Sequence, residues 1–212
     1  MSINNFPKVI PVFPLTNVIF FPRTILPLNI FEKRYIQLIN DCMKSQKLFG
    51  MVQPKSNINL KPEVYKVGCL GKIIKLNETE DKRFIIDLSG LIRFRIIEEL
   101  ATEKLYREFK VDYSDFTEDL NKNETCIEKV RESNLLKKIK LFFKKKNYLI
   151  ESKKLEKLDF NELVNTMFMI FPFSIEEKQK LIETIKMEDK IKVFEEIIDF
   201  GLFDNLENKT IQ

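Results

Sequence analysis

The hydrophobic pattern near the N-terminus changes from short extended runs to a helical period. Three prolines interrupt an uncharged apolar run there: Pro11, Pro14 and Pro22. Proline fixes φ and removes a backbone donor, so this run predicts short extended segments over residues 9–13, 18–21 and 24–28. An apolar stripe at helical spacing follows, and it predicts a helix of about three turns that buries one face. The stripe consists of Phe31, Tyr35, Leu38, Ile39 and Cys42.

Alternating patterns continue through the next sixty residues. Strands are predicted over residues 48–53, 66–76 and 83–88, and another begins after Ser89-Gly90. A last strand is predicted around Phe109, Val111 and Tyr113. Alternation of this kind places one face of each strand in a core. Several short strands with frequent turns therefore predict a twisted sheet or a partly closed barrel with one helix.

The pattern becomes helical after a polar segment, residues 114–123. Apolar stripes predict helices over residues 124–148 and 188–200, with Gly201 as a helix-ending glycine. Two further helices are predicted to begin at the capping pairs Asp159/Glu162 and Ser174/Glu177. The chain is therefore predicted to be α+β, with a β-rich subdomain over residues 1–118 and a helical bundle over residues 119–212.

The amino-acid composition excludes several kinds of catalytic and metal-binding site. The 212 residues include no histidine, which excludes Ser-His-Asp and Cys-His catalysis and histidine metal sites. The three cysteines, Cys42, Cys69 and Cys126, form no CxxC and indicate reduced thiols in a cytosolic protein. Neither GxxxxGK[ST] nor GxGxxG occurs. We therefore expect no catalytic residue, no metal and no cofactor.

No targeting signal is visible at the N-terminus. The early apolar run has no basic segment before it and is broken by prolines, unlike a secretory signal. No uncharged apolar run reaches the ~20 residues that a membrane span needs. These features predict a cytoplasmic protein that does not act at a membrane.

Three segments in order resemble one known family. The run PVFPL…IFFPRTILPLNIFEKRYIQLINDC…LFGMV, the glycine segment Val67–Ile73 and the strand LSGLIRFRI resemble the N-terminal substrate-binding domain of Lon proteases. The later FPFSIEEKQKLIE is similar to another segment of that domain. The resemblance implies a PUA-like pseudobarrel. Full-length Lon proteases carry an ATPase and a Ser-Lys peptidase after this domain, and this chain ends before them, so the resemblance implies recognition without catalysis.

The resemblance implies binding of exposed apolar polypeptide segments. The expected partners are unfolded or partly folded polypeptides, with a separate protease as a second candidate. Aromatic groups in proline-rich loops offer contacts at low entropic cost, although core packing is the alternative for each. These candidate substrate-binding residues are Phe13, Phe20, Phe21, Pro22 and Tyr65.

Two arginines complete the candidate set. Arg34 follows Glu32 as in the Glu-x-Arg-Tyr pattern of the family, and it either contacts a ligand or pairs with a carboxylate that pins the helix to the sheet. Arg93 shares a strand face with Arg95, and either contacts a ligand or forms an ion pair across the sheet.

A PUA-like nucleic-acid-binding module is the alternative from another class. The run KKIKLFFKKK, residues 137–146, is basic enough to contact phosphates. Its lysines lie mostly off the apolar stripe, as on a solvated helix face, and it lacks arginine, the usual base-reading residue. Nucleic acid is therefore not the expected partner. Salt separates the two functions, because phosphate binding weakens steeply with salt and apolar binding does not.

Overall fold

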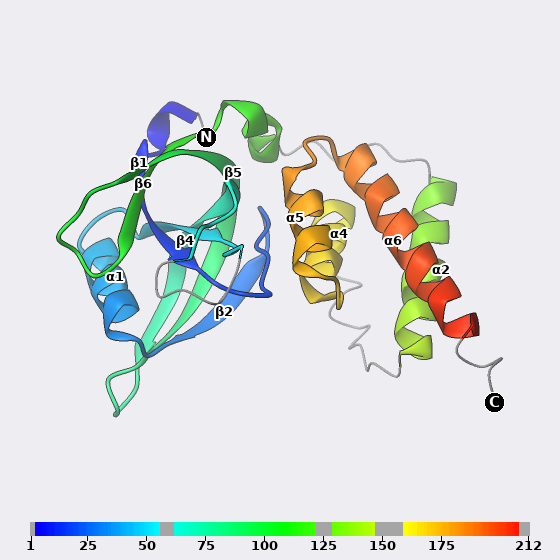
Figure 1. The fold of residues 1–212 in the computed structure, drawn as a ribbon, viewed down its shortest axis with the longest axis horizontal. Coiled ribbons are helices and arrows are strands. Elements are labelled where there is room, and N and C mark those ends of the chain that lie inside the picture. The colour runs from blue at the N-terminus through cyan, green and yellow to red at the C-terminus, as the bar shows by residue number, and fades with distance from the viewer. Residues whose placement is uncertain (1–2, 56–61, 122–128, 147–158, 208–212) are drawn as a thin grey trace.

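The computed structural model describes residues 3–55, 62–121, 129–146 and 159–207. Its N-terminal half is built from strands with one α-helix and two 3-10 helices, and its C-terminal half from α-helices (Figure 1). The first half contains η1 (Ile3–Asn5), β1 (Val9–Pro14), β2 (Ile25–Ile30), α1 (Lys33–Met43), β3 (Leu48–Val52), β4 (Val67–Glu78), β5 (Phe84–Leu100), β6 (Arg107–Asp112) and η2 (Ser114–Leu120). The second half contains α2 (Lys129–Lys145), α4 (Phe160–Ile170), α5 (Ile175–Glu183) and α6 (Met187–Glu207).

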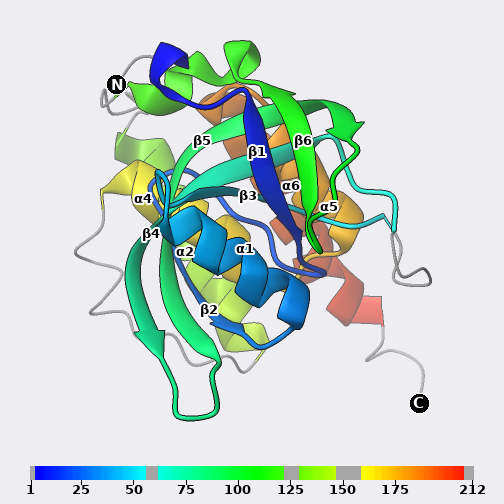
Figure 2. The same ribbon diagram turned by 90° about the vertical axis from the view of Figure 1, so that its left-hand side faces the viewer.

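The strands form one mixed sheet of six strands in the order β2-β5-β4-β3-β1-β6. The pair β1–β3 is parallel and the other neighbours are antiparallel. The second half of β5 also pairs with β6, so the sheet curls strongly. Helix α1 lies on one side of the sheet and the C-terminal helices lie on the other (Figure 2). The predicted α+β class is confirmed, whereas the PUA-like pseudobarrel stays a prediction.

Strand β5 is longer than the pattern indicates. Residues 83–88 and the segment after Gly90 were predicted as separate strands, but they form one strand of 17 residues. Gly90 lies inside it because another segment approaches closely: a Cβ there would lie 2.0 Å from the Phe21 carbonyl oxygen. The glycine therefore serves a contact between segments and not a turn.

The predicted stripe of α1 is confirmed at four positions and wrong at one. Tyr35, Leu38, Ile39 and Cys42 are buried. Phe31 precedes the helix and is 64% exposed. The chain leaves β2 at the buried Ile30, and the strand's alternation turns the next side chain outward. Phe31 therefore does not anchor the helix, and the expectation that it is buried is wrong.

The C-terminal helices pack through an aromatic core. Phe171 contacts the rings of Phe142, Phe143 and Phe194 at centroid distances of 4.7–4.8 Å. Ser174 and Glu177 form the predicted capping box of α5. Asp159 accepts from the backbone N–H of Glu162, as predicted for the start of α4. Gly201 was predicted to end the last helix and does not, because α6 continues to Glu207.

Helices α2 and α6 lie side by side (Figure 1) and are joined by ion pairs, of which Lys138–Asp199 spans 2.7 Å. The division of the chain at residue 118 and the bundle arrangement stay predictions. Within the described ranges, no helix has both the length and the apolarity that crossing a bilayer requires.

Candidate functional site at the seam between sheet and helices

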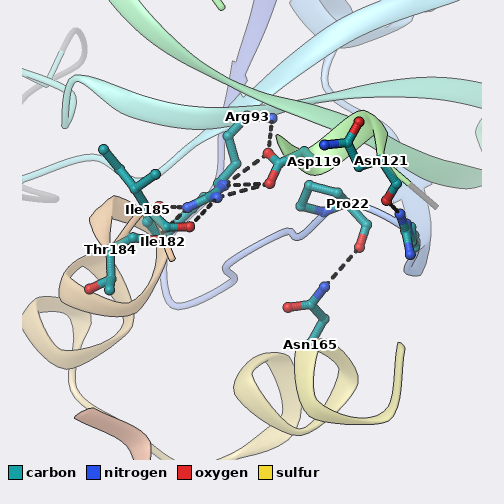
Figure 3. A network of polar contacts seen from close by, with 9 residues as sticks. Pro22, Arg93, Asp119, Asn121, Asn165, Ile182, Thr184 and Ile185 are labelled. Atoms are coloured by element: carbon teal, nitrogen blue, oxygen red, sulfur yellow. Dashed lines mark hydrogen bonds and ion pairs between the residues drawn. The ribbon is translucent and has the colours of Figure 1, made fainter. Parts of the chain in front are cut away.

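The segment between β1 and β2 forms the centre of the seam, which we define as the contact region between the sheet and helices α4–α6. Phe21 is fully buried there, and its ring lies 5.4 Å from that of Phe168 on α4. The carbonyl of Pro22 accepts a 3.2 Å hydrogen bond from Nδ2 of Asn165 (Figure 3). This apolar, proline-containing loop is therefore the surface on which α4 packs.

Arg93 is the polar clamp of the seam. It is 1% exposed, and its guanidinium pairs with the Asp119 carboxylate of η2 at 2.8 Å. The remaining N–H groups donate to three carbonyls at the end of α5: Ile182 (3.0 Å), Thr184 (2.6 Å) and Ile185 (3.0 Å) (Figure 3). A cation at the C-terminus of a helix is favourable because it satisfies the last carbonyls. Arg93 thus connects β5, η2 and α5 through one buried side chain.

Further polar contacts cross the seam, among them two made by side chains of α5. Nε2 of Gln179 on α5 donates to the carbonyl of Val67 at 3.3 Å. Nζ of Lys178 donates to the carbonyl of Asn17 at 2.8 Å. Burial lowers the pKa of Lys178. These bonds fix the angle of α5 on the sheet, since each donor reaches one backbone oxygen.

A pocket of about 180 Å³ lies within the seam. Lys190 of α6 lines it, is almost fully buried, and lies 5.8 Å from the centre of the Phe21 ring. Burial, helped by the positive charge of Arg93, lowers the pKa of Lys190 to about 7. Asn161 and Asn165 of α4 also line the pocket and are buried. The pocket is therefore lined by residues of both halves of the fold and is partly open to solvent.

The structure does not bring all of the predicted site residues together on one surface. Phe13, Phe20, Phe21 and Pro22 are buried, which is the core packing given as the alternative for these candidate binding residues. Packing explains it: Phe13 packs edge-on against Tyr35 at 4.0 Å, and Phe21 against the helices.

Of the three other residues, Tyr65 is half-buried and lines a depression beside α5. Arg34 is exposed and pairs with Glu32, two residues away, so it does not pin α1 to the sheet. Arg93 forms an ion pair, but with η2 and not across the sheet. Phe20, Phe21, Pro22 and Arg93 meet in the seam, where Phe20 lines a small cavity with Gln179 and Ile182 of α5.

A second surface carries exposed apolar side chains, and we call it the β2 face. It comprises Ile25, Pro27, Phe31, Ile74 and Ile85. Strand β2 is the outer strand of the sheet as described. Asn29 of β2 is paired with Ile85, and Phe31 follows two residues later. Pro27 is paired with Asp87, and Asp87 with Lys75, the neighbour of Ile74. The face therefore spans three adjacent strands.

The sequence analysis missed several of these residues. Asn161, Asn165 and Lys190 lie in or beside apolar helix stripes, and this interruption by polar groups was a usable signal. Asp119 fell in the polar segment taken as a boundary. Ile25 and Ile85 lie on predicted strands, but alternation alone does not tell which face meets solvent.

The fold and the seam define an α+β domain in which helices dock on a mixed sheet through a buried arginine. The family model for the "ATP-dependent protease La (LON) substrate-binding domain" matches residues 9–199. The chain belongs to this family, as the resemblance in the sequence indicated.

Relatives agree with this assignment. The chain is 27% identical over 199 residues to Lon protease 2 of Myxococcus xanthus and 25% identical over 195 residues to the Lon protease of Dictyoglomus thermophilum. These alignments cover 91% and 88% of this chain but only 24% of each relative. The chain thus matches about a quarter of each of these relatives.

Two solved structures share the fold. One is a Lon N-terminal domain protein from Xanthomonas campestris, with a TM-score of 0.62 and 17% identity. The alignment covers 91% of this chain and 98% of the Xanthomonas campestris chain. The other is the N-terminal domain of the Mycobacterium avium complex Lon protease, with a TM-score of 0.62 and 15% identity. The alignment covers 92% of this chain and 98% of the Mycobacterium avium complex chain. At these identities the likeness establishes the fold alone.

Proposed function

We propose that this chain binds exposed apolar segments of unfolded or partly folded polypeptides, and that the β2 face makes the contact. The observation that carries the proposal is the cluster of exposed apolar side chains on adjacent strands, combined with membership of a substrate-binding domain family. Contiguous apolar patches on a protein surface mark interaction sites more often than single exposed residues do.

The energetics suit weak and reversible binding. Phe31 and Ile25 are 64% and 59% exposed, so covering each of them contributes about 1–2 kcal/mol. Three or four such contacts, less the cost of ordering the bound segment, correspond to roughly micromolar affinity. Pro27 lacks a backbone N–H in the outer strand, which weakens this edge as a template for strand pairing. Side-chain burial is therefore the source of affinity in this proposal.

The remaining parts of the proposal follow from the family. We propose that the chain acts without catalysis, in the cytoplasm, alone or with a separate Lon-type protease. We also propose that the curled sheet is a PUA-like pseudobarrel, because β5 pairs with β2, β4 and β6.

The nucleic-acid alternative is weakened by the surroundings of α2. Lys138 pairs with Asp199, and Arg131 pairs with Glu195, so acids of α6 offset part of the basic helix. Exposed ion pairs of this kind lower the local positive potential available to phosphates.

The test compares matched exposed-residue variants. Carboxymethylated lactalbumin, which stays unfolded, is labelled and titrated with protein while fluorescence anisotropy is measured at low and high salt. The double variant Phe31→Ser/Ile85→Ser removes two anchors of the β2 face. Phe200→Ser is the control, because Phe200 is 70% exposed and belongs to α6, a helix that lies away from β2 (Figure 1). Thermal melts confirm that both variants fold.

We expect the double variant to bind about tenfold or more weakly, since two lost contacts amount to about 1.4 kcal/mol or more. The control keeps wild-type affinity, and salt has little effect. Equal weakening by Phe200→Ser would contradict the β2 face. Binding that disappears with salt or in a Lys144/Lys145/Lys146→Gln variant, and survives the double variant, would favour the nucleic-acid function instead.

A further inference from the structure

We infer that a groove at the end of α1 binds the side chain of a lysine or arginine that lies among apolar residues of a bound polypeptide. The groove has a volume of about 480 Å³, within the roughly 300–1,000 Å³ that is usual for ligand sites. It lies between the last turn of α1, strand β1 and the segment that leads into β6, on the side of the sheet opposite to α4–α6 (Figure 2). We call it the α1 groove.

The floor of the α1 groove is apolar and open to solvent. Val9 and Pro11 lie two positions apart on β1, so both side chains point from the same face of the sheet. Glu108 of β6 is paired with Pro11 and shares this face. Phe13, two positions further along β1, packs against Tyr35 of α1, whereas Val9 is 44% exposed. Helix α1 therefore covers one end of this face and leaves the other end accessible.

The chain places an ammonium group of its own in the groove. Nζ of Lys104 donates to Oε1 of Glu108 at 2.8 Å and lies 5.3 Å from the centre of the Tyr106 ring. Oγ1 of Thr102 donates to the other carboxylate oxygen of Glu108 at 3.1 Å, which orients the carboxylate. A carboxylate beside the face of an aromatic ring attracts a cation through its charge and through the ring quadrupole. The hydrogen bond to Glu108 raises the pKa of Lys104. Lys104 thus occupies the place of the proposed ligand group.

A second carboxylate lines the groove without a cation. Asp41, in the last turn of α1, accepts a 3.0 Å hydrogen bond from the Tyr106 hydroxyl. In the part of the chain that the structure describes, no lysine or arginine forms an ion pair with Asp41. The end of a helix favours cations, but the last turn of α1 contains no basic residue, and Lys44, which follows it, does not line the groove. The groove therefore contains two carboxylates and one ammonium group, and a further positive charge complements it.

Lys104 is easily displaced from this position. Its side chain is 42% exposed, and an exposed ion pair contributes little, because water screens it and the lysine loses rotamer freedom. An incoming ammonium or guanidinium group can therefore pair with Asp41 beside Lys104 or replace Lys104 at Glu108. The aliphatic part of the same side chain covers the apolar floor. An acidic segment is disfavoured, because its charge is repelled by both carboxylates.

This inference rests on the proposed function, because it assumes that the chain binds polypeptide segments, but it does not depend on the β2 face. The groove shares no residue with that face. A lysine preference at the groove is therefore measurable whether or not the β2 face binds unfolded lactalbumin.

The experiment is an anisotropy titration of two end-blocked peptides that carry an uncharged fluorophore, at physiological ionic strength. One peptide is Gly-Leu-Phe-Lys-Leu-Phe-Gly. The other has norleucine in place of lysine, which keeps the four-carbon side chain and removes the ammonium group. Asp41→Asn and Glu108→Gln remove the carboxylates singly, and Lys104→Gln removes the competing ammonium group. Asp189→Asn and Lys192→Gln are the matched controls, because they make the same changes in an exposed ion pair of α6, on the opposite side of the sheet (Figure 2). Circular dichroism confirms that each variant folds.

We expect the wild type to bind the lysine peptide about threefold to fivefold tighter than the norleucine peptide. Each carboxylate variant should reduce this preference to less than about twofold, whereas Lys104→Gln should raise it to about tenfold or more. The two controls, and the double variant Phe31→Ser/Ile85→Ser, should keep the wild-type preference.

Three outcomes overturn the inference: equal affinity for the two peptides, no saturation with either up to about 1 mM, or a preference that Lys104→Gln leaves unchanged. A change of the same size in Lys192→Gln also overturns it, because the effect then comes from the net charge of the protein and not from the groove. None of these outcomes contradicts the β2 face, which the lactalbumin titration tests separately.

Discussion

Replacing Lys190 with methionine should both stabilise the fold and remove part of its pH dependence. Burial lowers the pKa of Lys190 from 10.5 to about 7 in the folded protein, and the groups that surround it are Arg93, Asp119, Cys69 and Glu118. Below pH 7 both the folded and unfolded chains carry the charge, so its burial opposes folding fully. Between pH 7 and 10.5 the unfolded chain binds more protons, so stability rises with pH.

The size of the effect follows from the same pKa values. Each pH unit inside this window changes the free energy of unfolding by up to about 1.4 kcal/mol. Between pH 7 and 8.5 the wild type should therefore gain about 1–2 kcal/mol, and Lys190→Met should lack this gain. At pH 7 the variant should be more stable by about 1–4 kcal/mol, as for other buried charges replaced by apolar groups.

Urea unfolding followed by circular dichroism at pH 6, 7 and 8.5 measures this, since the chain has no tryptophan for fluorescence. Measurements stay below pH 9 because burial raises the pKa of Cys42 to about 12, which makes stability fall once unfolded thiols ionise. Lys192→Met is the control, because Lys192 is exposed on the same helix and forms an exposed pair with Asp189. Equal pH slopes in wild type and Lys190→Met would refute the reasoning, as would a variant that is less stable at every pH.

Two further substitutions test the seam in the same unfolding assay. Arg93→Met should lower the free energy of unfolding by about 3–5 kcal/mol, because Asp119 is left as a buried, unpaired carboxylate. Arg95→Met, which breaks an exposed pair with Asp115, should cost less than about 1 kcal/mol; equal losses would mean that Arg93 is not a clamp. Gly90→Ala should cost about 3 kcal/mol, since its Cβ meets backbone 2.0 Å away. An unchanged free energy of unfolding would show that the backbone at Phe21 shifts to make room for the added Cβ.

Local periodicity predicted most of the secondary structure. The stripe of α1 and the capping box at Ser174 are determined by residues three or four positions apart, so the chain sequence carries them directly. The ends of the elements were predicted less accurately. Gly90 and Gly201 were interpreted as breaks, because glycine usually marks a turn or a helix end. In this fold Gly90 makes room for a neighbouring segment, and Gly201 lies against Phe142 of α2.

The candidate site was predicted less well, because hydrophobicity does not distinguish a core residue from an exposed binding residue. Phe20 and Phe31 are the same residue type near the same prolines, yet one is 2% exposed and the other 64%. The difference arises from helices that begin more than a hundred residues later, since α4 and α5 cover the loop and leave Phe31 uncovered. No local pattern contains that information.

The polar seam has a physical consequence for the orientation of the two halves. An apolar contact tolerates sliding, because burial is proportional to area and is not directional. Arg93 reaches one carboxylate and three carbonyls, and those partners coincide in only one placement of α5 on the sheet. A displaced helix would leave these buried groups unpaired, at a cost of about 1–3 kcal/mol for each. The same requirement holds the seam pocket in shape, since its walls come from the sheet side and from α4 and α6. The desolvation of these buried polar groups therefore opposes folding, while their pairing with one another favours a single arrangement of the helices on the sheet.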